Sequence, residues 1–365
     1  YETLAEEPLY LRLATLEEFN GRSWNPNPVD DDPRNTVDEF PAPPGVASEV
    51  RRIEETATIR VGDISGRWLP LPYPTESVTG LQGEWLWERS GLTARSTDTG
   101  VGGQEYEVAF LDLEPTLEQV MAAVPRNEAD RVTLLLPSRI PDVVVETAEQ
   151  VGDGYATSYE RAMALQDYFQ SGEFEYSEDA PVERGYDGSG VDIIGRFLQE
   201  KSGYCVHYAS AMAIMARILG IPSRVAVGFQ PGQQVSVQGV TTYVVSSHDL
   251  HAWPELYFDD VGWLRFEPTP GRGDVPDYTA EPAVDDPATP EDEGATPAPS
   301  ATVRPSAAPE RPDQAGVDPD LPGRVPASAN PLPIVLGGIL LLVLVAAATP
   351  AVWRLLVRRR RERAI

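Results

Sequence analysis

An abrupt change in composition after residue 270 limits where this chain can fold. The stretch from Gly271 to Asn330 is rich in Pro, Ala, Asp, Glu and Thr and carries few large apolar side chains. Such a segment buries too little apolar surface to offset the conformational entropy lost on folding. We therefore expect residues 271–331 to form an extended, disordered linker, and the hydrophobic core to lie within residues 1–270.

An apolar stretch without charge follows the linker. Residues 332–352 read LPIVLGGILLLVLVAAATPAV, and Trp353 comes next. About 20 such residues span a bilayer as a helix, so the stretch predicts one transmembrane helix over 332–353. The tail at 354–365 holds six arginines, which the positive-inside rule assigns to the cytoplasm. The preceding part of the chain is then expected to lie outside the cytoplasm, anchored to the cell membrane by this helix.

The chain is strongly acidic, with a formal net charge of −28 at pH 7 and a pI of about 4.4. Nucleic-acid binding requires a basic face that contacts phosphates. No run of Lys and Arg precedes the C-terminal tail. We therefore expect no nucleic-acid partner.

Patterns typical of β-strands dominate residues 1–113. The segments GEWLWERSG (83–91) and QEYEVAFLDL (104–113) read as short strands. Turn-rich stretches such as 25–35 and 96–103 separate them. These patterns predict a small β-rich domain over residues 1–113.

Helical patterns begin at Thr116, a candidate N-cap, and strand patterns follow them. Apolar residues recur at helical spacing in four segments: 116–124, 141–151, 158–170 and 190–201. After a further helix, four segments read as successive antiparallel strands: 223–229, 241–247, 251–258 and 263–268. Residues 232–239 read as a flexible turn region. Helices followed by strands predict an α+β domain over residues 114–270.

Cys205, the only cysteine, begins the last of the predicted helices. Ala209, Met212, Ala213 and Ala216 follow at helical spacing and predict a buried helix face. At the start of a helix, the free backbone N–H groups and the helix dipole favour a thiolate and are candidate donors to an oxyanion. An inert buried thiol is the competing interpretation.

His251 opens one predicted strand, and Glu267 ends the next. The turn at 258–263 lies about midway between them, so a hairpin would bring the two side chains together. A carboxylate beside a histidine fixes its tautomer and stabilises the imidazolium. Cys205, His251 and Glu267 would then serve as nucleophile, base and orienting acid. The spacing does not by itself bring Cys205 to His251.

Zinc binding is the other use of these residue types. Cys205-x-His207 and His248-x-x-His251 would supply four ligands, but Cys-x-His at a helix start is not a usual structural zinc spacing. Residues three apart on a strand also point to opposite faces. We therefore expect no metal and no cofactor. His207 is expected on the helix surface or behind the catalytic residues, and His248 in a loop.

Three blocks together resemble the bacterial transglutaminase-like superfamily, in the order found there: CVHYASAMAIMARILGIPSRVAVGF, HAWPELYF and WLRFEPTPG. The resemblance is close over about residues 185–271 and looser from about residue 117. It implies a papain-like core of helices packed on an antiparallel sheet. It also implies Cys205 as nucleophile, His251 as base and Glu267 as the orienting acid, a position where the family more often has Asp.

The resemblance implies a membrane-anchored thiol acyltransferase, similar to protein-glutamine gamma-glutamyltransferases. Its expected substrates are proteins or peptides of the cell envelope. The acyl-enzyme can pass to an amine or to water, so deamidation and proteolysis stay open, as does a non-catalytic surface binding module. Tyr204 and Trp253 are candidates to line the acyl pocket, although packing is the simpler role for Trp253.

Overall fold

The computed structural model describes residues 1–27, 32–123, 131–276 and 278, all within a compact unit that spans Tyr1–Asp286. The predicted linker beyond residue 278, the predicted membrane helix at 332–353 and the basic tail lie outside the described residues. Within the described ranges, no helix is long and apolar enough to cross a membrane.

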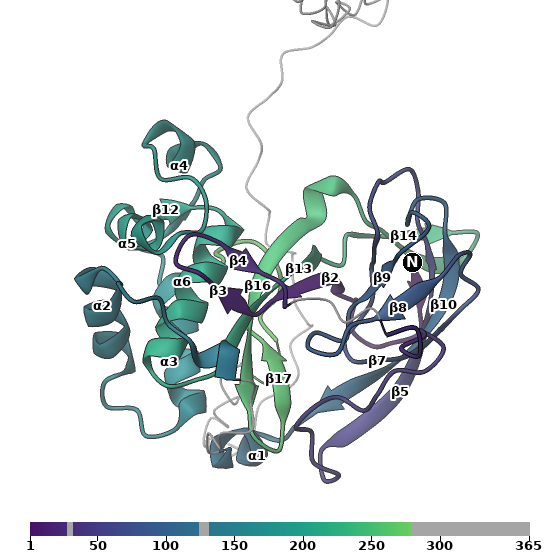
Figure 1. Ribbon diagram of the computed structural model, residues 1–365, viewed down its shortest axis with the longest axis horizontal. Coiled ribbons are helices and arrows are strands. Elements are labelled where there is room, and N and C mark those ends of the chain that lie inside the picture. Colours follow the sequence, from purple (N-terminus) through teal and green to yellow (C-terminus); the bar gives the residue numbers. More distant parts are fainter. Residues whose placement is uncertain (28–31, 124–130, 277, 279–365) are drawn as a thin grey trace, which may run out of the picture. The chain divides into compact units, whose positions relative to one another are not determined.

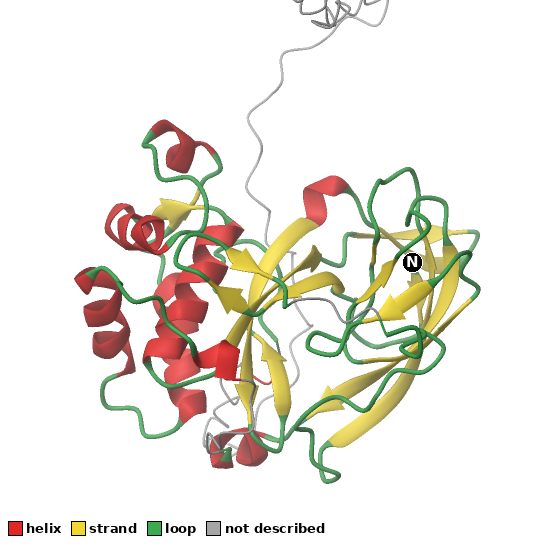
Figure 2. Cartoon of the chain, in the orientation of Figure 1, coloured by secondary structure: helices red, strands yellow, loops and turns green. Residues whose placement is uncertain are grey.

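A four-stranded antiparallel sheet forms the centre of this unit, in the order β17-β16-β13-β2 (Figure 1). Its strands are β2 (Leu11–Leu16), β13 (Ser223–Phe229), β16 (Leu250–Phe258) and β17 (Gly262–Arg265). Helices gather on one side of this sheet, as Figure 2 shows. They are α1 (Leu117–Ala122), α2 (Asp142–Gly152), α3 (Ser158–Gln170), α4 (Asp179–Glu183), α5 (Val191–Glu200) and α6 (Cys205–Ile218). Helices packed on an antiparallel sheet are the predicted α+β architecture.

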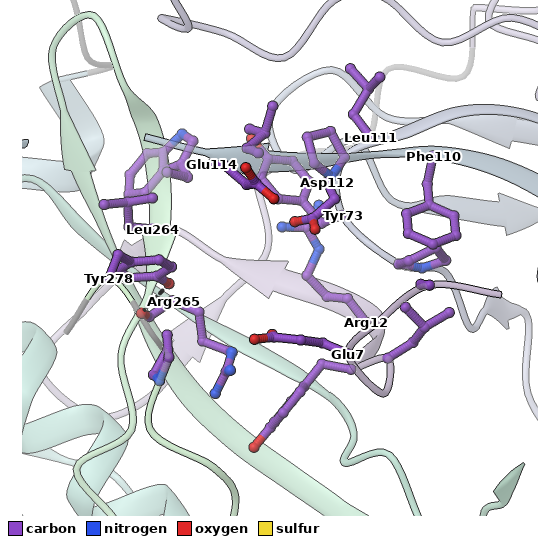
Figure 3. Close-up of a pocket in the computed structure, with 18 of the residues that line it drawn as sticks. Glu7, Arg12, Tyr73, Phe110, Leu111, Asp112, Glu114, Leu264, Arg265 and Tyr278 are labelled. Atoms are coloured by element: carbon purple, nitrogen blue, oxygen red, sulfur yellow. Dashed lines mark hydrogen bonds between the residues drawn. The ribbon is translucent and has the colours of Figure 1, made fainter. Parts of the chain in front are cut away.

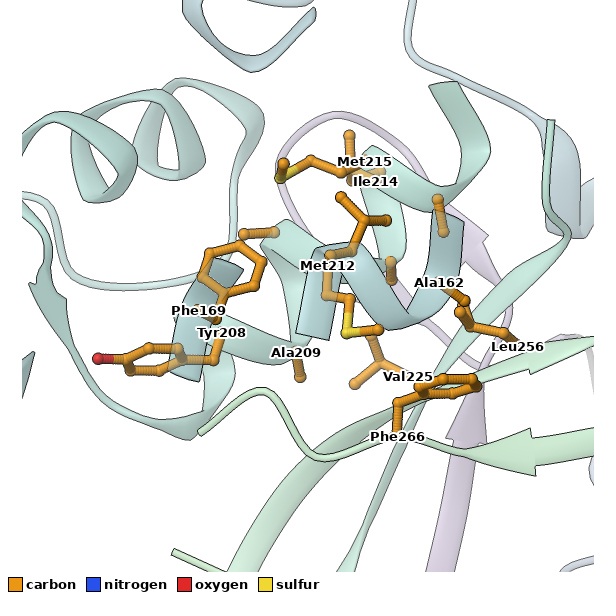
Figure 4. Close-up of a cluster of buried hydrophobic side chains, with 14 of the residues drawn as sticks. Ala162, Phe169, Tyr208, Ala209, Met212, Ile214, Met215, Val225, Leu256 and Phe266 are labelled. Atoms are coloured by element: carbon orange, nitrogen blue, oxygen red, sulfur yellow. The ribbon is translucent and has the colours of Figure 1, made fainter. Parts of the chain in front are cut away.

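Helix α6 is the central helix of this layer. It packs against β16 and β13, and nearly all of its side chains are buried. Its run of Ala and Met favours a helix, and a helix that is apolar on all sides belongs in a core. Met212 and Ala209 contribute to one cluster with Phe169 of α3, Val225 of β13 and Phe266 (Figure 4). Burial of each large side chain of this kind stabilises the fold by about 1.5–3 kcal/mol.

The remaining strands belong to the N-terminal part of the chain and enclose a second core. One sheet has the order β1-β5-β10-β7, formed by Glu2–Thr3, Arg51–Arg60, Glu105–Glu114 and Thr75–Thr79. Another has the order β6-β9-β8, formed by Trp68–Leu69, Ala94–Ser96 and Trp85–Trp87, and β3 (Glu18–Phe19) pairs with β4 (Trp24–Asn25). Alternation in β10 turns Tyr106 and Val108 inward. This region is β-rich, as its sequence predicts.

Strand β2 is the exception, because it comes from the N-terminal region and pairs with β13 of the central sheet. The buried Arg12 side chain of β2 bonds both carboxylate oxygens of Glu255 on β16 at 3.0 Å. Arg224 of β13 contacts the same carboxylate at 2.6 Å. The predicted boundary at residue 113 is therefore crossed by a strand and by a buried ionic cluster.

The predicted turn region at 232–239 is mostly strand. Residues Gln233–Val237 form β14, which pairs with β15 (Val240–Val244) in a separate two-stranded sheet. The turn prediction was wrong there. Gln, Ser and Gly among the valines indicate a turn locally, whereas pairing with β15 stabilises the segment as a strand. The remaining short elements are β11 (Glu175–Tyr176), β12 (Ser202–Gly203) and the 3-10 turns η1 (Arg131–Leu134) and η2 (Ser247–Asp249).

Candidate active site

Cys205 is the first residue of α6, as the sequence predicts, and it is 9% exposed. The chain enters this helix from β12, which pairs with β11 in parallel. Gly203 is required at this entry, because a Cβ there would lie 2.9 Å from the Phe197 ring and 3.1 Å from His207. The tight entry turn thereby places the thiol at the end of the helix where backbone N–H groups are free of intrahelical partners.

The buried His207 side chain stabilises the start of α6. It lies in the interior rather than on the helix surface. Nδ1 accepts the backbone N–H of Tyr204 at 3.3 Å, and Nε2 lies 3.3 Å from the carbonyl oxygen of Tyr186. Burial lowers the pKa of His207, so the neutral ring with hydrogen on Nε2 fits both contacts. His207 therefore has a structural role behind Cys205.

His251 and Glu267 form a buried pair. His251 lies near the start of β16, and Glu267 follows β17, so the β16–β17 hairpin brings them together. The distance from His251 Nε2 to Glu267 Oε2 is 2.8 Å, and both side chains are at most 1% exposed. The other carboxylate oxygen, Oε1, accepts the backbone N–H of Thr269 at 3.0 Å. The longer side chain of Glu thus reaches the imidazole in place of Asp.

Cys205 acts on His251 electrostatically. Burial alone would lower the pKa of His251, but the Cys205 and Glu267 side chains outweigh it and raise that pKa to about 9. Because Glu267 occupies Nε2, Nδ1 is the nitrogen left for the thiol. Within the described part of the chain, Nδ1 is buried and has no hydrogen-bond partner. Cys205 therefore influences the ring without a hydrogen bond to Nδ1, and bonds of this kind often form only when substrate binds.

Tyrosines border the cysteine. Tyr204 precedes it and donates its hydroxyl hydrogen to Asp187 at 2.8 Å. Burial, the bond to Asp187 and the nearby Cys205 raise the pKa of Tyr204. Tyr176 was not anticipated from the sequence, because β11 is only two residues long. Burial raises the pKa of Tyr176 to about 12, with Cys205 as the next contribution.

Trp253 packs behind the histidine. It is 2% exposed, its ring stacks with that of His251 at a centroid distance of 6.2 Å, and Tyr10 meets its edge at 5.3 Å. This placement makes Trp253 a support for the imidazole ring.

A pocket of about 440 Å³ is lined in part by Trp253 and lies between the β-rich region and the central sheet. Aromatic and acidic side chains line it, with Tyr73, Asp112 and Glu114 on one side and Arg265 and Tyr278 on the other (Figure 3). None of the three proposed catalytic residues lines this pocket. It is therefore distinct from the Cys205 site.

The histidines do not assemble into a metal centre. In the described ranges, no group of three or more His, Cys, Asp and Glu side chains is arranged to hold a metal ion. His248 lies in η2 with its side chain exposed, while Nε2 of His251 is bonded to Glu267. Both ring nitrogens of His207 also have partners, in Tyr204 and Tyr186.

Two family models match the folded part of the chain. One, described as the transglutaminase-like superfamily, matches residues 145–268, which include Cys205, His251 and Glu267. The other, described as the TgpA N-terminal domain, matches residues 1–117. Residues 145–268 thus form a transglutaminase-like domain. A third model, described as Alphavirus glycoprotein J, matches residues 270–365, which lie almost wholly outside the described residues.

Curated relatives of this transglutaminase-like chain come from two bacteria. It is 25% identical over 303 residues to Uncharacterized protein YebA of Bacillus subtilis (strain 168), covering 77% of this chain and 39% of the relative. It is 25% identical over 268 residues to Protein-glutamine gamma-glutamyltransferase of Pseudomonas aeruginosa, covering 72% of this chain and 36% of that protein. The chain thus spans less than half the length of either relative.

Solved structures bear out the fold. The periplasmic domain of TgpA from Pseudomonas aeruginosa, crystallised with ethylmercury, matches with a TM-score of 0.52 and 22% identity, covering 73% of this chain and 87% of that one. A second crystal structure of that domain gives a TM-score of 0.51 and 23% identity, with 73% and 85% coverage. The prediction of a transglutaminase-like core of helices on an antiparallel sheet is confirmed.

Proposed function

We propose that this protein is a thiol acyltransferase that forms a thioester between Cys205 and the side-chain acyl group of glutamine in proteins or peptides. The observation that carries the proposal is the buried His251–Glu267 pair, 2.8 Å apart, whose imidazole is also acted on by Cys205. A helix-start cysteine, a histidine and an orienting carboxylate are the parts that thiol acyl transfer requires.

Acylation follows from this arrangement. With the pKa of His251 raised to about 9, the ring is protonated at neutral pH. The proposed nucleophile is the thiolate form of Cys205. The Cys205 sulfur attacks the carbonyl carbon of the amide, and the free N–H groups at the start of α6 stabilise the oxyanion. His251 donates its Nδ1 proton to the departing nitrogen, so that ammonia leaves and the thioester remains.

Deacylation reverses the roles of the groups. An amine attacks the thioester carbonyl, His251 accepts its proton, and the thiolate leaves, which yields a new amide. Water in place of the amine yields a carboxylate instead, so that the net reaction is deamidation. Attack on a main-chain amide would make the same residues a peptidase. Glu267 keeps the proton of Nε2 in place throughout, which leaves Nδ1 to exchange protons with the reacting groups.

An extracytoplasmic location at the cell membrane is part of the proposal. The solved relatives are named as a periplasmic domain, and the sequence carries the apolar stretch at 332–352 followed by arginines. Proteins and peptides of the cell envelope are then the substrates within reach, and the membrane is the anchor.

The test is to incubate the full chain, in detergent micelles, with a glutamine-containing peptide and a primary amine. We expect mass spectrometry to show the amine joined to the glutamine, with none joined in Cys205→Ser. Conversion of the glutamine to glutamate, or cleavage of the peptide, would instead make the protein a deamidase or a peptidase. If none of the three products depends on Cys205, the protein is a binding module rather than an enzyme. Lys201, the only lysine, keeps self-crosslinking to a minimum.

A further inference from the structure

Two glutamines of α3 bond both polar groups of the Glu267 backbone. Gln166 Oε1 accepts the backbone N–H of Glu267 at 2.8 Å, and Gln170 Nε2 donates to its carbonyl oxygen. The glutamines are four residues apart, so they lie on the same face of the helix. Gln166 is 1% exposed, whereas Gln170 ends the helix and is exposed. The catalytic sheet and the helical layer are thus joined at the residue that carries the triad carboxylate.

Glu267 needs partners from the helical layer because it lies beyond the end of the β16–β17 ladder. The last pair in register is Glu255 with Arg265, and the last backbone bond runs from Phe266 to the carbonyl oxygen of Pro254 at 3.0 Å. Glu267 itself is fully buried. A buried backbone group without a hydrogen-bond partner destabilises the fold. The two side-chain amides supply the bonds that a neighbouring strand would otherwise make.

The contacts to Glu267 also limit where its carboxylate can lie. The glutamines fix the peptide groups on both sides of its Cα atom, and the backbone N–H of Thr269 holds Oε1 at 3.0 Å. Oε2 is then the oxygen presented to His251. A Glu side chain has more rotatable bonds than Asp and loses more entropy when it is fixed, so a fixed backbone matters more for Glu267 than it would for Asp.

From these contacts we infer that Gln166 and Gln170 are positioning residues that set the Glu267 backbone so that its carboxylate holds His251 in the catalytic orientation. This inference rests on the proposed function. Neither glutamine touches the reacting atoms, and neither carries a charge. Replacement of either glutamine therefore affects Cys205 only indirectly. It displaces the Glu267 carboxylate, and this displacement lowers the pKa of His251.

The experiment compares Gln166→Met and Gln170→Met with the unmodified full chain in detergent micelles. The matched control is Gln104→Met, which removes another buried glutamine that bonds the backbone of Gln82 and Gly100 in the β-rich region. The readout is the rate of Cys205 alkylation by iodoacetamide across pH. We expect each α3 variant to slow alkylation at neutral pH by about tenfold to 100-fold, the scale for a displaced catalytic group. We also expect the rise of the alkylation rate with pH to move to higher pH, because the thiolate is the reacting form and loses part of its imidazolium partner.

Gln104→Met should lose stability and keep the alkylation profile of the unmodified chain. If the α3 variants also keep that profile, the inference is wrong. Because Gln170 is exposed, Gln170→Met carries the test should Gln166→Met fail to fold. A slow rate in Gln170→Met with no shift in the pH at which alkylation accelerates would mean a general loss of structure and would also overturn the inference.

A double-mutant cycle separates the inference from the proposed function. In the Glu267→Gln background, Gln170→Met should slow alkylation little further, because both changes act through one carboxylate. Fully additive losses would show that Gln170 acts by another route. If the unmodified chain alkylates no faster than His251→Ala, the proposed function itself fails. If the unmodified chain is fast and the α3 variants match it, only the positioning role fails.

Discussion

Gly228 of β13 lies directly opposite His251 of β16 in the central sheet. On its other side, Gly228 meets β2 so closely that a Cβ would stand 2.2 Å from the carbonyl oxygen of Leu11. The strand contributed by the N-terminal region therefore packs against the residue that neighbours the proposed catalytic histidine. The two regions matched by separate family models are one structural unit at this point.

Replacement of Gly228 should damage both the sheet and the site. Gly228→Ala forces a methyl group against the β2 backbone, and overpacking of this kind costs about 1–3 kcal/mol. We expect the free energy of unfolding to fall by this amount in chemical denaturation, together with slower Cys205 alkylation. Gly62→Ala is the control, because a Cβ there meets no atom within 4 Å. Equal stability of the two variants would contradict the close approach.

The buried cluster around Glu255 should hold β2 to the sheet. Burial would raise the pKa of Glu255, but Arg12 and Arg224 outweigh it and lower that pKa. Glu255→Gln removes the carboxylate that both buried guanidinium groups contact and leaves Arg224 only the more distant Glu17, at 3.9 Å. Loss of one partner of a buried ion pair costs about 3–5 kcal/mol. The exposed pair of Arg51 and Glu114 offers the comparison, since Glu114→Gln should change the denaturation midpoint little. A similarly small change in the denaturation midpoint of Glu255→Gln would show that Glu255 does not hold β2 to the central sheet.

His251 should control the reactivity of Cys205. Without the imidazolium, the thiolate loses its partner, so His251→Ala should slow alkylation of Cys205 at neutral pH by about 100-fold or more. The control is His248→Ala, because His248 lies three residues earlier with an exposed side chain. Stopped-flow or discontinuous mass spectrometry would measure both rates. Similar rates in both variants would remove His251 from the mechanism.

Activity should depend on pH through the proton of His251. The pKa of this group is raised to about 9, since Cys205 and Glu267 together outweigh burial. Catalysis that needs the imidazolium is then present below this pH and is lost as the pH rises through about 9, with an apparent value that belongs to the Cys–His pair. Glu267→Gln removes one stabilising charge, so the alkaline limb of kcat/KM should move to lower pH. An unmoved limb would show that Glu267 does not act on His251.

Local signals in the sequence were sufficient for several features of this protein. The start of α6 at Cys205 was predicted from its apolar spacing, and the capping role of Thr116 is confirmed by its bond from the Gln119 backbone. The approach of His251 and Glu267 followed from the turn between two strands. Each of these features depends on residues close in the chain, where spacing translates directly into geometry.

Contacts between distant residues were decided only by the tertiary structure. Nothing local to Arg12 indicates that it bonds Glu255, and nothing local to Gln166 or Gln170 indicates that they bond the Glu267 backbone. The same holds for the pairing of β14 with β15 in a sheet of their own.

The sequence by itself determined the chemical groups, the helix that presents the thiol and the hairpin that joins histidine to acid. The tertiary structure alone decided that Cys205 of α6 lies close enough to His251 to raise its pKa, that β2 pairs with the central sheet and that α3 bonds the Glu267 backbone. The physical reason is that local backbone preferences act over a few residues only. These contacts join segments far apart in the chain, and separation in sequence does not indicate distance in space.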